Sequence, residues 1–266
     1  MIDDVLRGFP ARKGRVAARA QLARALWNKK GERKLAGERE LDDALARQSA
    51  EDLDWLCELS PLAPLYLLPT RRFVNALARQ LRALQVTRVL EVAAGDGLLS
   101  RSLQRAAPEL EVHASDSGAW TDAKARMTRA EREQHHDVPG LRLGANVVQL
   151  DADKAIRRFR PELVLCSWLP PGHMLDALVR ARVKYVLELG AGGGITGSVY
   201  GWRFAHEFLE GELEQSARCR LDLRPRVELH SRATLYYGRA HDSYYEEQVQ
   251  RGDWLYQFRP RTPRAR

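Results

Sequence analysis

Two stretches of the sequence combine an acidic residue with closely spaced small residues, a pattern that can hold a nucleotide-like cofactor. The first, VLEVAAGDG, covers residues 89–97, and the second, VLELGAGGG, covers residues 186–194. In each, an apolar run typical of a buried strand leads into a turn where the absence of large side chains lets a ligand approach the backbone. Either stretch could therefore be the cofactor turn of an α/β sheet.

The residues that follow each turn favour the first one. A cofactor turn needs a helix after it and then a second strand, whose terminal acid, about 20 residues on, can accept hydrogen bonds from ribose hydroxyl groups. LLSRSLQRAAP has a helical pattern, and the strand expected over 110–115 ends at Asp116. After residue 194 too little chain remains to complete a parallel sheet. We therefore expect the second turn to follow the fifth strand, with GAGGGITGS as a mobile loop beside the site.

Three aromatic residues stand where they could face an acceptor. Trp168 leaves the strand PELVLCSW, and Tyr200 and Trp202 lie in GSVYGWR, after the second glycine turn. Aromatic rings make good contact with a planar acceptor or a cationic group, and they equally serve as anchors of a core. We expect all three to form walls of an acceptor pocket, with a place in the core as the alternative.

Histidines are the candidates for a general base, which is needed only if the acceptor enters protonated. His173 follows two prolines in LPPGHM, and His206 lies in GWRFAHEFLEGELEQ, a stretch that we expect to be helical from residue 201. Each could instead be structural. His135 and His136 have no partner at ligand spacing, so no metal site is predicted.

The elements that must position these residues change in kind along the chain. Residues 15–58 have the apolar spacing of helices, a proline-rich linker follows, and a helix is expected over 71–84. From there on, short apolar runs alternate with helical patterns, which predicts an α/β fold with a mostly parallel sheet and helices on both faces. ATLYYGRA indicates a late, antiparallel strand. The predicted organisation is a helical extension and linker over 1–70, a cofactor-binding domain over 71–250 and a basic tail over 251–266.

The first turn resembles a known motif. Glu91, Ala93, Gly95 and Gly97 stand at the spacing of the E/D-x-G-x-G-x-G motif of class I S-adenosylmethionine-dependent methyltransferases, with Ala93 in place of the first glycine. The resemblance covers about residues 65–240. It implies a Rossmann-like, seven-stranded sheet that binds S-adenosylmethionine, and we expect the small residues of the turn to make room for the cofactor.

The resemblance also implies roles for residues on the neighbouring strands. Asp116 matches the acid that binds the ribose, and Asp151 with Ala152 matches the pair that addresses the adenine amino group. Ser167 falls on the fourth strand, where the family meets the cofactor methionine and the substrate. For Glu91 the alternative is an acid that caps loop amides, and for the two aspartates it is helix N-capping.

Basic charge is concentrated at the two ends of the chain. The formal net charge is +8. Residues 1–40 carry eleven Lys and Arg against five Asp and Glu, and residues 251–266 carry five Arg against one Asp, so the central part is near neutral. These ends could be solvated termini or a surface for a polyanion. With no long apolar run, no secretory signal and three scattered cysteines, we expect a soluble cytoplasmic protein without disulfides and without a membrane role.

The preferred function is S-adenosylmethionine-dependent methyl transfer to a small-molecule acceptor. The acceptor would be enclosed by the carboxyl edge of the sheet, the N-terminal helices and the loop at 190–202. One alternative is a tRNA or rRNA methyltransferase whose basic termini hold phosphates, although no RNA-binding module is recognisable. The other is a non-catalytic cofactor-binding or assembly protein, against which the intact glycine turn and Asp116 count.

Overall fold

The structure is a computed structural model that describes residues 16–30, 32–49, 65–119, 143–191, 196–211 and 232–247. Its centre is a seven-stranded sheet in the order β3-β2-β1-β4-β5-β7-β6. The strands are β1 (Arg88–Val92), β2 (Glu111–Asp116), β3 (Val148–Gln149), β4 (Leu163–Ser167), β5 (Tyr185–Gly190), β6 (His206–Phe208) and β7 (Arg232–Tyr237). The strands β1 to β5 are parallel, and β7 is antiparallel to both of its neighbours. The predicted fold class is confirmed, and the second glycine turn follows the fifth strand as expected.

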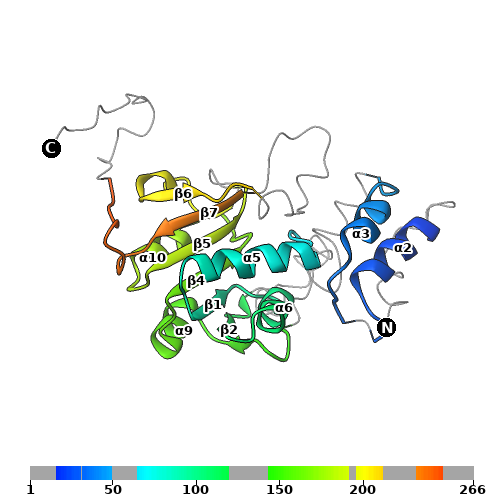
Figure 1. The fold of residues 1–266 in the computed structure, drawn as a ribbon, viewed down its shortest axis with the longest axis horizontal. Helices are drawn as coiled ribbons and strands as arrows, with labels where there is room; N and C mark the ends of the chain where they lie inside the picture. Colours follow the sequence, from blue (N-terminus) through cyan, green and yellow to red (C-terminus); the bar gives the residue numbers. More distant parts are fainter. Residues whose placement is uncertain are drawn as a thin grey trace, which may run out of the picture.

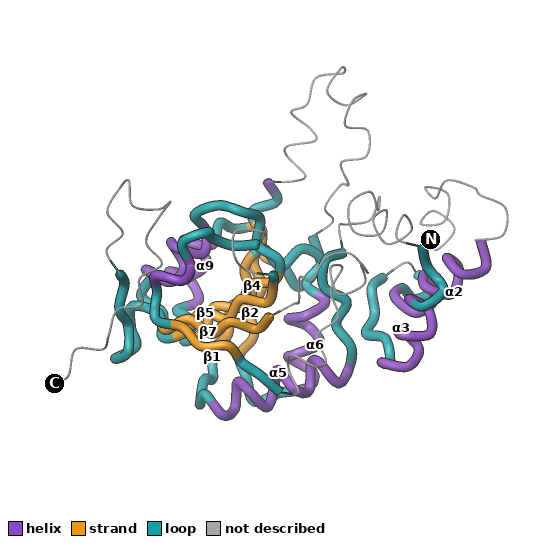
Figure 2. The backbone as a smooth tube through the Cα atoms, turned by 90° about the horizontal axis from the view of Figure 1, so that it is seen from above, coloured by secondary structure: helices purple, strands orange, loops and turns teal. Residues whose placement is uncertain are grey.

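Helices cover both faces of the sheet, as the alternating patterns predicted. They are α2 (Val16–Leu26), α3 (Glu38–Leu45), α5 (Arg71–Ala83), α6 (Leu98–Ala106), α9 (Ala152–Phe159), α10 (Met174–Arg180) and the short 3₁₀ helix η2 (Gly201–Arg203). The helices α5 and α6 lie on one side of the strands and α9 on the other (Figure 2). The pair α2 and α3 stands at the far end of the molecule, beyond α5 and α6 (Figure 1).

The two faces of the sheet form two apolar clusters. Because successive side chains of a strand point to opposite faces, neighbouring residues belong to different clusters. Val89 and Leu165 pack with α5 and α6, whereas Leu90 and Val164 pack with α9 and α10. All four side chains are buried. A parallel sheet covered on both faces needs apolar residues at consecutive positions, which explains the uninterrupted apolar runs in the sequence.

The N-terminal extension has an apolar cluster of its own, to which α2, α3 and Leu65 contribute. The continuous helical pattern expected over 15–58 is wrong between α2 and α3, where Trp27 pairs with Arg33 in an isolated antiparallel bridge. Asn28 explains the interruption, because its Oδ1 accepts hydrogen bonds from the amides of Lys30 and Glu32 at 2.9 and 3.0 Å. An asparagine side chain that binds nearby amides competes with helical hydrogen bonding.

The helix expected from residue 201 onward is also wrong. After the single turn of η2 the chain becomes β6, in which His206 pairs with Tyr236 of β7. Without β6, the outer side of β7 would have unpaired amides and carbonyls, and a strand satisfies them where a helix cannot. Phe204, fully buried just before β6, anchors the change of direction.

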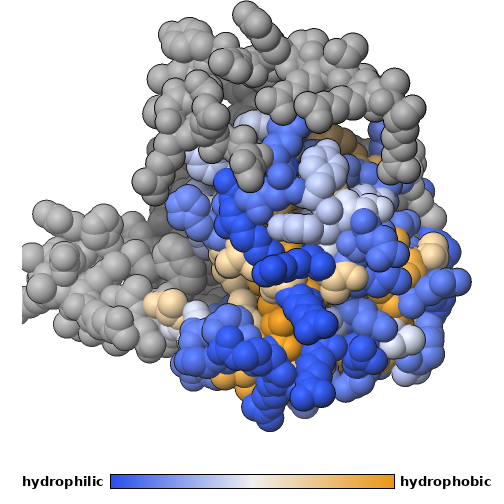
Figure 3. All heavy atoms as spheres, turned by 90° about the vertical axis from the view of Figure 1, so that its left-hand side faces the viewer, coloured by the Kyte–Doolittle hydropathy of each residue, from blue (hydrophilic) through white to orange (hydrophobic). Residues whose placement is uncertain are grey.

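In the described part of the chain, no helix is long and apolar enough to cross a membrane. On the face turned to the viewer in Figure 3, polar and charged side chains cover most of the described surface, with small apolar areas between them.

Candidate cofactor site

The first glycine turn joins β1 to α6 at the carboxyl edge of the sheet. Three of its residues have positive φ: Ala93 at 52°, Gly95 at 55° and Gly97 at 64°. This left-handed conformation suits glycine and costs a residue with a Cβ about 1–2 kcal/mol, so Ala93 bears a cost that a glycine would avoid. Gly97 is the N-cap of α6. The strand, turn and helix predicted from VLEVAAGDG are therefore present.

Gly97 makes room for another segment of the chain. A Cβ at Gly97 would lie 2.6 Å from Asn146 Nδ2 and from Val147 Cγ2. Asn146 Nδ2 donates hydrogen bonds to the Gly97 carbonyl and to Ser100 Oγ, both at 3.1 Å. Protein packing and the positive φ already require glycine at this position, so the expectation that the missing side chain makes room for the cofactor stays a prediction here.

Asp116 ends β2, where the sequence predicted the ribose-binding acid, and it lies directly beside the turn. Its Oδ2 accepts a hydrogen bond from the Gly95 amide at 3.1 Å, and its Oδ1 accepts one from the Gly118 amide at 2.8 Å. Each carboxylate oxygen has a second lone pair. The buried side chain can therefore hold the turn in place and still accept hydrogen bonds from a ligand.

Glu91 lies in β1 and is only 3% exposed. Its Oε2 accepts a hydrogen bond from the amide of Ser100, the third residue of α6, at 2.9 Å. Burial raises the pKa of Glu91 from its ordinary 4.5 to about 7, although the hydrogen bonds with Ser100 oppose the shift. The sequence predicted that Glu91 either contacts the cofactor or caps loop amides. The described contacts show the second role, because Glu91 caps an amide in the first turn of α6.

The ends of β3 and β4 flank those of β2 and β1 because of the strand order. Asp151 is the N-cap residue of α9, but its side chain caps no amide and instead pairs with Lys154 at 2.8 Å. The Leu150 amide donates to the Asp116 carbonyl at 2.8 Å, which brings the loop before α9 next to β2. Ala152 begins α9, and Ser167 ends β4. The predicted cofactor residues thus share the carboxyl edge.

Trp168 follows β4 at this same edge and has an unusual conformation. Its φ is 51°, which is rare for a large side chain and indicates local strain. Its ring stacks on that of Tyr66, with centroids 5.4 Å apart and planes inclined by 13°. The indole Nε1 is buried and has no hydrogen-bond partner among the described residues. A strained aromatic residue with an unused donor is a good candidate for ligand contact.

The two histidines lie in different surroundings. His173 precedes α10, and its side chain is 84% exposed, with Nδ1 3.7 Å from Asp176 Oδ2. His206 pairs with Tyr236, which in turn pairs with Val186 near the amino end of β5. The register therefore places His206 away from the carboxyl edge, and the idea that it serves as base at the predicted site is not supported.

Tyr200 and Trp202 follow a stretch that is joined to the loop after Trp168, where the Gly197 amide donates to the Leu169 carbonyl at 3.0 Å, and their role as walls of an acceptor pocket stays a prediction. The segment that contains them packs on the face of the sheet, where a Cβ at Gly201 would lie 2.9 Å from the Tyr236 hydroxyl. The ring of Tyr200 faces the Arg203 guanidinium, and Trp202 is 57% exposed. The glycines at 192–194 of the second turn lie outside the described residues, as do His135 and His136.

Two contacts at the site were not predicted. Tyr66 belongs to the linker SPLAPLYLLPT, and its aromatic ring among prolines was the available signal. Asn146 gave no signal, because a polar residue before a short strand is common in loops. Its importance depends on the fold, which brings it to Gly97 across 49 residues.

The sheet order, the antiparallel β7 and the small-residue turn between β1 and α6 are those of the class I methyltransferase fold that the resemblance implied. No protein-family model and no curated protein matches the sequence. Similar solved structures include the methyltransferase domain of bacterial CtHen1, with a TM-score of 0.38 and 10% identity, covering 63% of this chain and 98% of that one.

Two further structures are similar at the same level. The 23S rRNA methyltransferase ErmE has a TM-score of 0.35 and 18% identity, covering 66% of this chain and 70% of its own. The precorrin-6y C5,15-methyltransferase from Geobacter metallireducens GS-15 has a TM-score of 0.33 and 11% identity, covering 62% and 87%. A likeness of this degree concerns the fold and carries no conclusion about activity.

Proposed function

We propose that this protein binds S-adenosylmethionine at the carboxyl edge of the sheet and transfers its methyl group to a small-molecule acceptor. The observation that carries the proposal is the hydrogen bond from the Gly95 amide to Asp116 Oδ2, at 3.1 Å. It joins the acid at the end of β2 to the small-residue turn after β1, which are the two elements that a ribose-bearing cofactor needs.

The residues at this edge fit the cofactor. Bound S-adenosylmethionine supplies an electrophilic methyl group. Asp116 would accept hydrogen bonds from the ribose hydroxyls with its remaining lone pairs, since one carboxylate can receive both. Asp151, about half exposed at the start of α9, would accept from the adenine amino group.

Trp168 and Tyr66 support an acceptor site next to Ser167. Their stacked rings offer a flat apolar wall, and the Trp168 indole N–H offers one hydrogen bond that no described residue takes up. Methyl transfer is an in-line displacement, so the positioning of the acceptor and the exclusion of water can provide much of the acceleration. The described residues at this wall do not include a base, and a neutral acceptor does not need one.

Calorimetry tests the cofactor part of the proposal. We expect the wild-type protein to bind S-adenosylmethionine and S-adenosylhomocysteine, and Asp116→Asn to weaken binding by about 1–3 kcal/mol through loss of charged hydrogen bonds. Asp153→Asn is the matched control, because Asp153 is an exposed acid that pairs with Arg157 at 2.6 Å and has no predicted contact with the cofactor. Absence of binding to either compound, or an equal loss in both variants, would refute the assignment.

Transfer of a labelled methyl group separates the acceptor classes. The protein is incubated with methyl-labelled S-adenosylmethionine and with the small-molecule or the RNA fraction of an extract of the cells that make it. We expect label in the small-molecule fraction, reduced by Trp168→Ala more than by Trp168→Phe, which keeps a ring. Label in RNA alone would support the nucleic-acid alternative, and binding without any transfer would support a non-catalytic role.

A further inference from the structure

A cavity of about 980 Å³ lies between the N-terminal extension and the helices α5 and α6. Its lining comes from the segment at 27–35, from one side of α5 and of α6, and from the segment at 143–146. Asp96 of the cofactor turn and Leu98 at the start of α6 also line it. Asp116, Asp151 and Trp168 do not line it, so this cavity is separate from the candidate cofactor site.

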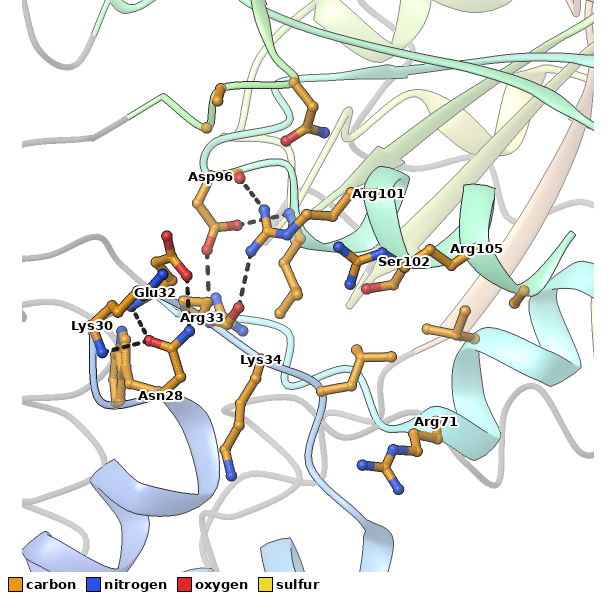
Figure 4. A pocket seen from close by; sticks show the side chains of 18 of the residues that line it. Asn28, Lys30, Glu32, Arg33, Lys34, Arg71, Asp96, Arg101, Ser102 and Arg105 are labelled. Atoms are coloured by element: carbon orange, nitrogen blue, oxygen red, sulfur yellow. Dashed lines mark hydrogen bonds and ion pairs between the residues drawn. The ribbon is translucent and has the colours of Figure 1, made fainter. Parts of the chain in front are cut away.

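The charges around this cavity are unbalanced. Its basic lining residues are Lys30, Arg33, Lys34, Arg71, Arg101 and Arg105, and its acidic ones are Glu32 and Asp96. In the close-up, Lys34 extends from the segment after α2, Arg71 from the start of α5 and Arg105 from α6, so these cations come from three different elements (Figure 4). Like charges that line one cavity repel one another, and an anion between them makes the arrangement more favourable.

Only part of this positive charge is compensated by the described residues. Arg33 Nε lies 3.8 Å from Asp96 Oδ2, and Lys34 Nζ lies 3.6 Å from Glu40. Arg101 donates hydrogen bonds to the backbone carbonyls of Asp96 and Arg33, so it holds the cofactor turn and the extension together. These contacts fix Arg33 and Arg101 as parts of the cavity wall.

Three cations remain for a ligand. Lys30, Arg71 and Arg105 form no ion pair with any residue in the described ranges, and all three are exposed. Arg71 is also the first residue of α5, and its amide already donates a hydrogen bond to the Ala36 carbonyl at 3.4 Å, so only its side chain is left for a ligand. Two arginine side chains and a lysine favour a phosphate group, which guanidinium groups bind through paired hydrogen bonds.

The volume of the cavity and its apolar lining residues indicate what kind of ligand fits it. Trp27, Leu65 and Val74 provide an apolar surface beside the cations. The volume of about 980 Å³ is near the upper end of the range for small-molecule sites, which is about 300–1,000 Å³. A ligand that combines phosphate groups with an apolar or planar part would satisfy both regions.

We propose that this basic cavity binds a phosphate-bearing ligand, held by Lys30, Arg71 and Arg105 against the outer side of the cofactor turn. Two kinds of ligand carry such phosphate groups: a free phosphorylated small molecule, and RNA through its phosphodiester backbone. The volume favours the small molecule. The proposal goes beyond the function assigned to the carboxyl edge and does not depend on it.

Binding of tripolyphosphate and of a single-stranded RNA of about 12 nucleotides tests this proposal, in a buffer of about 50 mM salt and again at about 200 mM. The full chain is titrated by calorimetry with tripolyphosphate and by fluorescence anisotropy with labelled RNA. The test variant is Arg71→Ala with Arg105→Ala. The matched control is Arg182→Ala with Arg239→Ala, because both of these exposed arginines lie outside the cavity.

We expect tripolyphosphate to bind and the cavity variant to weaken it at least about tenfold, the effect of losing hydrogen bonds to a charged group. The control should bind like the wild type. RNA binding with the same loss, a steep decrease with salt and no tripolyphosphate binding would support the cavity with nucleic acid as the source. No binding of either probe at low salt, or equal weakening in both double variants, would overturn the proposal.

Folding of each variant is checked by circular dichroism before titration. If the double variant does not fold, the single variants Arg71→Ala and Arg105→Ala replace it, each with the expectation of a smaller but measurable loss. Unchanged tripolyphosphate and RNA affinity in both single variants would also overturn the proposal.

Discussion

Replacement of Glu91 by Gln gives a direct test of how β1 holds α6. Glu91 is buried and accepts the Ser100 amide at 2.9 Å. Because its pKa rises from 4.5 to about 7 on folding, the folded protein retains a proton that the unfolded chain has already lost between these values. The stability that this group contributes is therefore fully present below about pH 4.5 and is lost as the pH rises through about 7.

The size of the effect follows from the shift. With a pKa near 7, Glu91 is about nine-tenths protonated at pH 6 and about nine-tenths ionised at pH 8. Over this interval its linkage lowers the free energy of unfolding by about 1.4 kcal/mol. The Glu91→Gln variant keeps an oxygen that can accept the Ser100 amide and has no proton to lose, so this part of the pH dependence should disappear.

Urea unfolding of both proteins at pH 6, 7 and 8 measures this difference. The other titrating groups are common to the two proteins and cancel in the comparison. We expect the variant to gain about 1.4 kcal/mol relative to the wild type between pH 6 and pH 8, with unchanged m values. If the free energies of unfolding of the two proteins change in parallel with pH, Glu91 does not titrate between pH 6 and pH 8. The interpretation that Glu91 is a buried, protonated acid that caps α6 would then be refuted.

Four further variants test other parts of the structure. In Gly97→Ala, the alanine must adopt a positive φ and its Cβ would lie 2.6 Å from the segment before β3. We therefore expect urea unfolding to show that the free energy of unfolding falls by about 2 kcal/mol or more, whereas Ala93→Gly should cause no loss. Arg203→Ala leaves the buried Asp176 carboxylate without its partner at 3.1 Å, and a loss of about 3 kcal/mol is expected; a loss below about 1 kcal/mol would contradict this. His173→Ala should keep methyl transfer because the side chain is 84% exposed, and a decrease beyond about tenfold in the folded variant would restore His173 as a base.

The sequence by itself determined the features that depend on short stretches of chain. The apolar runs specified the parallel strands, because a strand buried on both faces shows an uninterrupted apolar pattern. The small residues of VLEVAAGDG and the spacing to Asp116 located the turn beside the end of β2, since one helix and one strand suffice to bring them together. The resemblance to a methyltransferase motif rests on this same local pattern.

Only the tertiary structure decided what depends on distant partners. His206 lies in β6 because the edge of β7 offers it backbone hydrogen bonds, and its local helical pattern could not reveal this. Gly97 is required by Asn146, and Trp168 is covered by Tyr66, through contacts between segments far apart in the chain. The basic cavity likewise exists only because α5 and α6 bring their arginines opposite the turn after α2. Charge counting along the sequence placed the excess at the termini, whereas folding brings basic residues from three segments of the chain to the lining of one cavity.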